Sequence, residues 1–123
     1  MSPTARTLAE CKRRGWIAQV VEQTIPRTFI KRDLFGVIDI IAVEPSRSLT
    51  GGMVCDLVVP GRIIGIQATS GTNHAARVAK AKAEPRTAHW LGAGGVLEIW
   101  SWSKRGGKGK RKLWVLREEA VVL

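Results

Sequence analysis

The sequence predicts an α/β fold in which a central mixed β-sheet is flanked by helices. Residues 35–43 contain seven apolar residues around one carboxylate, a pattern typical of a central strand that is covered on both faces. Residues 62–69 and 96–102 also have strand patterns, and helix signals stand before the first strand and after residues 62–69. The expected order is helix, three strands, helix, two strands. With 123 residues, of which 45% are hydrophobic, the chain 1–123 fits a single domain.

The first elements of the chain are expected to be a helix and a strand. Ser2 or Thr4 can cap a helix, and Gly15 is a stop signal for its end. Residues 16–25 then have the composition of a strand. The basic stretch 27–34 is predicted to connect this strand to the central one.

The second half of the chain contains clear breakers and one glycine-rich turn. Pro85 predicts the end of a helix, and the glycines and cations of residues 104–112 predict the tip of a hairpin. The expected elements are a loop at 46–52, a short strand or hairpin arm at 53–59, a strand at 62–69, a helix from Thr72 or Asn73 to about Ala83, and two strands at 96–102 and 113–116.

The charge of the chain points to a polyanionic partner. Lysine and arginine number 20 against 10 acidic residues, which gives a net charge of +10. Nucleic acid is the commonest partner of so basic a small protein, and no basic amphipathic helix favours a membrane surface instead. No apolar run reaches the ~18 residues of a membrane span, and no signal peptide is visible. We therefore expect a cytoplasmic protein, in the host cytoplasm if it is phage-encoded, with Cys11 and Cys55 as reduced thiols.

Asp39 is the residue of the central strand that needs an explanation. A carboxylate among apolar residues loses hydration, which is costly unless a partner or a metal ion compensates. The period of two places Gln67 and Thr69 on one face of the next strand. If the two strands are neighbours, these three side chains converge at one end of the sheet, in the layout of a metal-dependent phosphodiesterase site.

Several other polar residues are candidates for the same site. Asp33 is either a turn residue or a second metal ligand, and Glu10 is either a solvated helix acid or a site residue. The start of the helix after residue 72 would favour an anion. The residues expected to contact nucleic acid are Lys31, Arg32, Asn73, Arg77, Lys80, Lys104, Arg105, Lys108, Lys110, Arg111 and Lys112.

The remaining aromatic and histidine residues are better explained by structure. Trp100 and Trp102 are expected to pack in the core or on the sheet rather than to stack on bases. His74 is expected to be hydrogen-bonded or solvated rather than to contact a phosphate. The cations of residues 104–112 would form either a finger that contacts phosphates or a solubilising loop.

Four short motifs accompany the expected order of elements: Gly15-Trp16 and the stretches at 31–39, 65–70 and 73–77. Together, the motifs and the element order resemble the PD-(D/E)XK nuclease superfamily, and within it the small Holliday-junction-resolvase-like and VRR-NUC-like proteins of phages and prophages. The likeness covers nearly the whole chain. The resemblance implies a restriction-endonuclease-like three-layer fold, a DNA substrate, an Mg²⁺ or Mn²⁺ cofactor and a homodimer.

The resemblance also assigns roles to individual residues. By position, Asp39 is similar to the metal-binding aspartate, Gln67 replaces the acid of the third strand, and Thr69 replaces the lysine beside it. Glu10 is similar in place to the helix-one glutamate of resolvase-like members. Such enzymes hold Mg²⁺ between the aspartate and that acid, and the lysine assists the attacking water.

Two departures from the family pattern bear on activity. A glutamine carbonyl can ligate Mg²⁺ but adds no charge, so Asp33, Glu10 or Glu22 would have to strengthen the site. Thr69 carries no positive charge, which Arg77 or Lys80 would have to supply from the following helix. The sequence therefore predicts a metal-dependent deoxyribonuclease, with a non-catalytic nucleic-acid-binding protein of the same fold as the alternative. An RNA-associated structural protein unrelated to nucleases is a third, weaker hypothesis.

Overall fold

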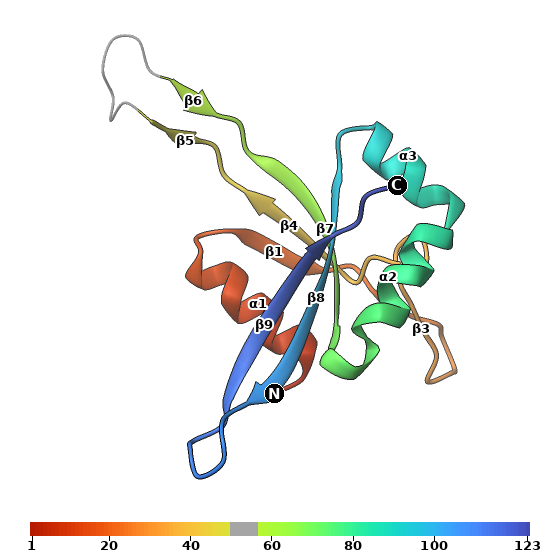
Figure 1. Ribbon diagram of the computed structural model, residues 1–123. Helices are drawn as coiled ribbons and strands as arrows, with labels where there is room; N and C mark the ends of the chain where they lie inside the picture. Colours follow the sequence, from red (N-terminus) through yellow and green to blue (C-terminus); the bar gives the residue numbers. More distant parts are fainter. Residues whose placement is uncertain (50–56) are drawn as a thin grey trace.

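A five-stranded mixed sheet forms the centre of the molecule, as the computed structural model of residues 1–49 and 57–123 shows (Figure 1). Its strands are in the order β1-β4-β7-β8-β9, and short ribbons of β2 with β3 and of β5 with β6 extend from it. The elements are α1 Pro3–Arg13, β1 Ile17–Val20, β2 Gln23–Thr24, β3 Lys31–Arg32, β4 Ile40–Glu44, β5 Arg47–Ser48, β6 Val58–Val59, β7 Arg62–Ser70, a 3₁₀ turn Gly71–Asn73, α2 His74–Ala83, α3 Pro85–Gly92, β8 Val96–Arg105 and β9 Leu113–Ala120.

The predicted mixed sheet is confirmed. β7 and β8 pair in parallel, and the other neighbours in the sheet pair antiparallel. A parallel pair needs a long crossover connection, and α2 and α3 provide it. β4 and β7 are neighbours with Ile40 opposite Ile66, so the two strands expected to carry the site do lie side by side.

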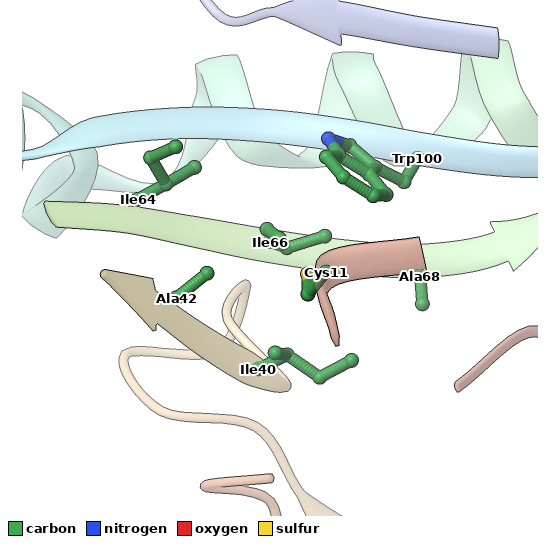
Figure 2. Packing of buried hydrophobic residues seen from close by; sticks show 7 residues of the cluster. All are labelled: Cys11, Ile40, Ala42, Ile64, Ile66, Ala68 and Trp100. Atoms are coloured by element: carbon green, nitrogen blue, oxygen red, sulfur yellow. The ribbon is translucent and has the colours of Figure 1, made fainter. Parts of the chain in front are cut away.

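Helices cover both faces of the sheet, which gives three layers (Figure 1). On one face Cys11 of α1 packs against Ile40, Ile66 and Trp100 (Figure 2). On the other face Val78 and Ala81 of α2 pack with apolar residues of β8 and of the segment before β4. Side chains of β7 therefore point alternately to the two faces of the sheet. Ala68 faces the α1 side, and its neighbours Gln67 and Thr69 face away from it.

The first helix follows its sequence signals. Ser2 is the N-cap, and its hydroxyl accepts a hydrogen bond from the amide of Ala5 at 3.1 Å. Gly15 follows the helix with a φ of +79°, a left-handed conformation that glycine adopts without a steric penalty. The chain then turns directly into β1.

The strand expected at residues 16–25 is shorter, which corrects the prediction. β1 ends at Val20, and after the amide of Val21 donates to the carbonyl of Asp39 at 2.9 Å the chain leaves the sheet. It forms β2, which pairs with β3 inside the stretch expected to be a basic connector. The chain after β1 thus pairs with a nearby segment instead of continuing along the sheet.

The strand expected at residues 35–43 begins only at Ile40. Leu34 and Ile38 exchange two backbone hydrogen bonds, of 2.7 and 3.0 Å, and so close a tight turn before it. Phe35 and Gly36, between them, have φ values of 54° and 75°. Asp39 therefore lies at the entrance of β4 rather than within it.

Four further elements differ from the expectation. α3 occupies residues for which the sequence analysis expects no helix or strand, because Pro85 both ends α2 and stands in the first turn of the next helix, where Glu84 caps it. β8 and β9 are longer than the predicted strands. β5 lies within an expected loop and pairs with β6, while the rest of the expected hairpin arm, residues 53–56, lies outside the described part of the chain.

The structural interpretations of the aromatic and histidine side chains are confirmed. Trp100 is fully buried, and the indole N–H of Trp102 donates to the hydroxyl of Thr7 at 3.0 Å. His74 is buried and hydrogen-bonded on both ring nitrogens. Cys11 is a free, buried thiol, and Cys55 lies outside the described residues. None of the helices described is long and apolar enough to cross a membrane.

Candidate metal centre

A hollow of about 620 Å³ lies where β4 begins and β7 ends. Six parts of the chain meet there: the start of α1, the segment after β1, β3, the turn before β4, the end of β7 and the first turns of α2. The hollow brings together most of the residues that the sequence singled out, which are Asp33, Asp39, Gln67, Thr69, Lys31, Arg32, Asn73, Arg77 and Lys80.

Asp39 is held at the floor of this hollow by neighbours from β7. Its carboxylate accepts the backbone amide of Ala68 at 3.1 and 3.3 Å and the side-chain amide of Gln67 at 3.1 Å. The backbone amide of Asp39 in turn donates to the carbonyl of Ile66 at 3.1 Å. The side chain is only 4% exposed, so its position is fixed by the sheet rather than by solvent.

Two further carboxylates approach Asp39. One oxygen each of Glu22, Asp33 and Asp39 lies within 4.8 Å of the others. Asp33 and Asp39 stand on either side of the tight turn closed by Leu34 and Ile38, so the turn sets their separation. Glu22 reaches the cluster because its neighbour Val21 is bonded to the backbone of Asp39.

The electrostatics of the cluster favour a bound cation. Burial raises the pKa of Asp39 to about 7, and the negative charges of Asp33 and Glu22 act in the same direction, while the amide of Ala68 acts in the opposite one. A divalent cation among three carboxylates would offset their mutual repulsion and stabilise the ionised form of Asp39. These acidic residues could hold a metal ion, and oxygen ligands of this kind suit a hard cation such as Mg²⁺.

Gln67 and Thr69 lie on the same wall of the hollow. Both side chains are nearly fully buried, with 5% and 6% exposure, and both line the space beside Asp39. The amide nitrogen of Gln67 is engaged with Asp39, and the same group carries a carbonyl oxygen, which is a neutral ligand that Mg²⁺ accepts.

Positive charge surrounds the acidic cluster. Lys31 and Arg32 of β3 line one side of the hollow, and Arg77 and Lys80 of α2 line the other. Lys31 also lies 3.5 Å from the carboxylate of Glu22. Asn73 stands at the start of α2, where its amide donates to Ser70 at 3.2 Å. Carboxylates at the floor and cations at the rim form an arrangement that can bind a metal ion and a phosphate together.

Glu10 and the glycine-rich loop do not reach this hollow. The carboxylate of Glu10 is bound by Arg13 at 2.6 Å and by Arg14 at 3.1 Å, which lowers its pKa. It lines a different hollow beside Trp102. The basic residues Lys104, Arg105, Lys108, Lys110, Arg111 and Lys112 lie at the end of the β8–β9 hairpin.

Sequence reasoning gave Glu22 only a minor place, although it is a full member of the cluster. Glu22 belongs to a stretch expected to be one continuous strand, in which it would point to a face of the sheet. The signal that could have found it is the polar pair Glu22-Gln23 after two valines, where the strand pattern ends.

No protein-family model matches this chain, and no curated protein or solved structure is significantly similar to it. The resemblance to PD-(D/E)XK nucleases therefore stays a prediction that depends on the motifs of the chain itself.

Proposed function

We propose that this protein is a metal-dependent nuclease with a restriction-endonuclease-like fold that hydrolyses phosphodiester bonds of DNA, on branched or structured substrates. One observation carries the proposal: the cluster of Glu22, Asp33 and Asp39 lies at the floor of a hollow that is lined by cations. Carboxylates alone would repel a phosphate, and cations alone would not activate water. Their combination in one hollow supports phosphodiester hydrolysis.

In this proposal the residues of the hollow have different roles. Glu22, Asp33 and Asp39, with the carbonyl oxygen of Gln67, would hold Mg²⁺ or Mn²⁺, which supplies an activated water and charge neutralisation at the leaving oxygen. Thr69 lies beside this position without a charge of its own. Arg77 and Lys80 would stabilise the negative charge that develops on the phosphate, and Lys31, Arg32 and Asn73 would orient the DNA strand.

The alternative is a protein of the same fold that binds nucleic acid without cutting it. The observation that favours it is the pair Gln67 and Thr69, which stands where the resemblance implies an acid and a lysine. Burial also raises the pKa of Asp39 to about 7, so without a cation this residue carries only part of its charge at neutral pH. In that case the cations of the hollow and of the loop would act through charge alone.

Cleavage assays with purified protein distinguish the proposed nuclease from the non-catalytic alternative. Single-stranded, duplex and four-way-junction DNA would be incubated with Mg²⁺, Mn²⁺ or EDTA, with Asp39→Ala and Asp39→Asn alongside. We expect cleavage with either metal, none in EDTA, and a loss of at least about 100-fold in both variants, the order of effect of a group that stabilises the transition state electrostatically. Salt-sensitive DNA binding without cleavage under any of these conditions would support the non-catalytic alternative.

Glu10→Gln is the informative control for that experiment. The ion pairs of Glu10 with Arg13 and Arg14 hold it away from the hollow, so this variant should keep the wild-type rate, whereas Glu22→Gln and Asp33→Asn should lose most of it. A rate that falls with Glu10→Gln but not with Glu22→Gln would assign the metal to other ligands than the ones proposed.

We also propose that the protein acts as a homodimer, as the resemblance implies. Ile17, Val43 and Ile63 lie opposite one another across β1, β4 and β7, and they are 76%, 42% and 53% exposed. Exposed apolar side chains in a row support an interface between copies. Sedimentation equilibrium of the wild type and of Val43→Lys would test it, since a monomeric wild type would refute the dimer.

A further inference from the structure

A second hollow opens beside the metal centre and has a different chemistry. It has a volume of about 510 Å³ and shares Arg32, Asp33 and Gly36 with the first hollow, so the two are adjacent. Its own walls are Phe35 and Leu34 of the tight turn, Val21, Gln23 of β2 and Arg86 of α3. An aromatic ring, a guanidinium group and an amide thus surround a space next to three carboxylates.

The wall made by Phe35 and Arg86 is suited to a flat, unsaturated group. The guanidinium carbon of Arg86 lies 5.9 Å from the centre of the Phe35 ring, and Glu84 holds that guanidinium through a bond of 2.8 Å from Nε. The Phe35 ring is also supported by Trp90, whose ring centroid is 6.3 Å away. Phe35 remains 38% exposed. Aromatic rings and guanidinium planes are the groups on which proteins stack nucleic-acid bases.

The backbone of Phe35 adds an independent observation. Its φ of 54° lies in the left-handed region, where a bulky aromatic residue is an outlier. Strained positions of this kind cluster at functional sites. The turn is closed by the bridge between Leu34 and Ile38, and the two metal-ligand candidates Asp33 and Asp39 flank it. The ring of Phe35 is therefore held at a fixed place relative to the metal centre.

We propose that this second hollow binds one unpaired DNA base next to the phosphate that is cut. The proposal rests on the proposed function, because the phosphate in the first hollow brings the neighbouring nucleotide to the second. The base would stack on Phe35 and the Arg86 guanidinium, with the side chain of Gln23 as a hydrogen-bonding partner at its edge. In a continuous duplex the bases are stacked and paired, so this wall is accessible only to a base that has left the stack. The hollow therefore selects strand ends, flaps, mismatches or junction points over an intact duplex.

The proposal can be tested by equilibrium binding in EDTA, where a metal-dependent nuclease leaves its substrate whole. Three labelled DNAs of one length would be compared by fluorescence anisotropy: a single strand, a blunt duplex, and a duplex with one unpaired 2-aminopurine. The fluorescence of 2-aminopurine, which falls when the base stacks, gives a second readout. We expect the wild type to prefer the unpaired substrate and to quench its 2-aminopurine.

Substitutions at Phe35 and Arg86 then assign this preference to the hollow. Phe35→Gly fits the left-handed backbone and should weaken binding of the unpaired substrate by about five-fold to a hundred-fold, the range measured when a base-stacking side chain is removed, while duplex binding stays the same. Phe35→Tyr keeps the ring and should restore the preference. Arg86→Lys keeps the charge without the plane and should reduce binding of the unpaired substrate and the quenching.

The matched control is Phe29→Gly, because Phe29 is the other phenylalanine of the chain, is fully exposed and does not line the hollow. Equal affinity losses on all three DNAs, or the same loss with Phe29→Gly, would overturn the proposal. If Phe35→Gly failed to fold, unchanged binding and quenching in Arg86→Lys would overturn it instead. A wild type that binds DNA without preference would remove the base site and leave the proposed function intact, whereas a wild type that binds none of the three would remove both.

Discussion

At the scale of single residues, the surroundings of Asp39 have two opposing effects on it. The folded protein stabilises its position through the amides of Ala68 and Gln67, and it destabilises its charge through burial and through two neighbouring carboxylates. A residue selected by packing alone would be apolar or an amide at this place. The presence of a carboxylate that the fold holds at a cost supports a role in which a cation completes the site.

The cost can be measured as a dependence of stability on pH. The pKa of Asp39 is about 7 in the folded protein and near 3.8 in the unfolded chain, so between these values the folded state binds the additional proton. The contribution of Asp39 to stability is then full below pH 3.8 and is lost as pH rises through 7. In EDTA we expect the free energy of unfolding to fall by about 2 kcal/mol from about pH 5.5 to pH 8 through this residue alone.

Asp39→Asn isolates that effect. An asparagine can accept the amide of Ala68 through its oxygen, and its nitrogen can donate to the carbonyl oxygen of Gln67 once that side-chain amide rotates by about 180°, so the site keeps two hydrogen bonds without a titrating group. Urea unfolding at both pH values should show the fall in the wild type and not in the variant, which becomes the more stable protein at pH 8. Half-buried carboxylates with lowered pKa values, such as Glu44 and Glu84, complete their titration below this range. A variant with the same fall as the wild type would contradict the raised pKa.

The direction of an individual side chain at the site could be predicted only where a regular strand fixes it. Gln67 and Thr69 alternate with Ala68 along one regular strand, so the sequence alone predicts their common face. Asp39 is conspicuous as a single charge in an apolar run. Phe35 belongs to the same run, and the position of its ring could not be predicted. The left-handed backbone at Phe35 turns the ring toward Arg86, and the apolar composition of the run does not indicate that conformation.

At the scale of elements, the number and order of the main strands were predictable and several boundaries were not. The apolar run from Val37 to Val43, interrupted by Asp39 alone, fits a turn that is buried by α2 as well as a strand, and only Gly36 indicates the break. Pro85 predicts the end of one helix, although the same residue also begins α3. β2 and β3 are too short for the alternating pattern of a strand to be visible in the sequence. They are strands because they pair with each other.

The start of α2 depends on a buried hydrogen-bonded group that joins three elements. His74 bonds Ser101 of β8 at 2.7 Å and Glu119 of β9 at 3.0 Å, and both His74 and Ser101 are almost fully buried. His74→Ala removes both bonds, leaves the buried hydroxyl of Ser101 without this partner and opens a cavity. We expect the free energy of unfolding to fall by about 2–4 kcal/mol, measured by urea denaturation.

The other histidine of the chain provides the control for this prediction. His89 is exposed on α3, so His89→Ala should change the stability by less than about 0.5 kcal/mol. Ser101→Ala, alone and with His74→Ala, completes a double-mutant cycle whose coupling we expect to be between about 0.5 and 3 kcal/mol. Equal effects of the two histidine substitutions would show that the bonds of His74 do not stabilise the packing of α2 on the sheet.

At the scale of the whole molecule, the hollow and the basic loop share one end of the sheet. β7 ends at Ser70, which lines the hollow and lies opposite Trp102 of the parallel strand β8. β8 continues to Arg105, so the loop begins about 10 Å beyond the end of β7, three residues at the rise of a strand. The net charge of +10 predicts a polyanionic partner without saying where it binds, because composition carries no positions. The topology adds positions to this prediction, since it brings the cations of the loop to the end of the sheet where the cluster of Glu22, Asp33 and Asp39 lies.

This arrangement predicts that the loop contributes to the binding of DNA and not to the chemical step. Lys108→Gln with Lys110→Gln should weaken duplex binding and reduce the slope of log K against log salt by about 1.8, or about 0.9 for each phosphate that is no longer neutralised. The single-turnover cleavage rate at saturating DNA should not change, because neither lysine lines the hollow. The matched control is Lys12→Gln with Lys82→Gln, which removes the same charge from exposed helix positions that do not line the hollow either. If both pairs reduced the slope equally, the loop would act only through the net charge of the protein, and if the loop pair also slowed the saturated rate, its cations would have to reach the reacting phosphate.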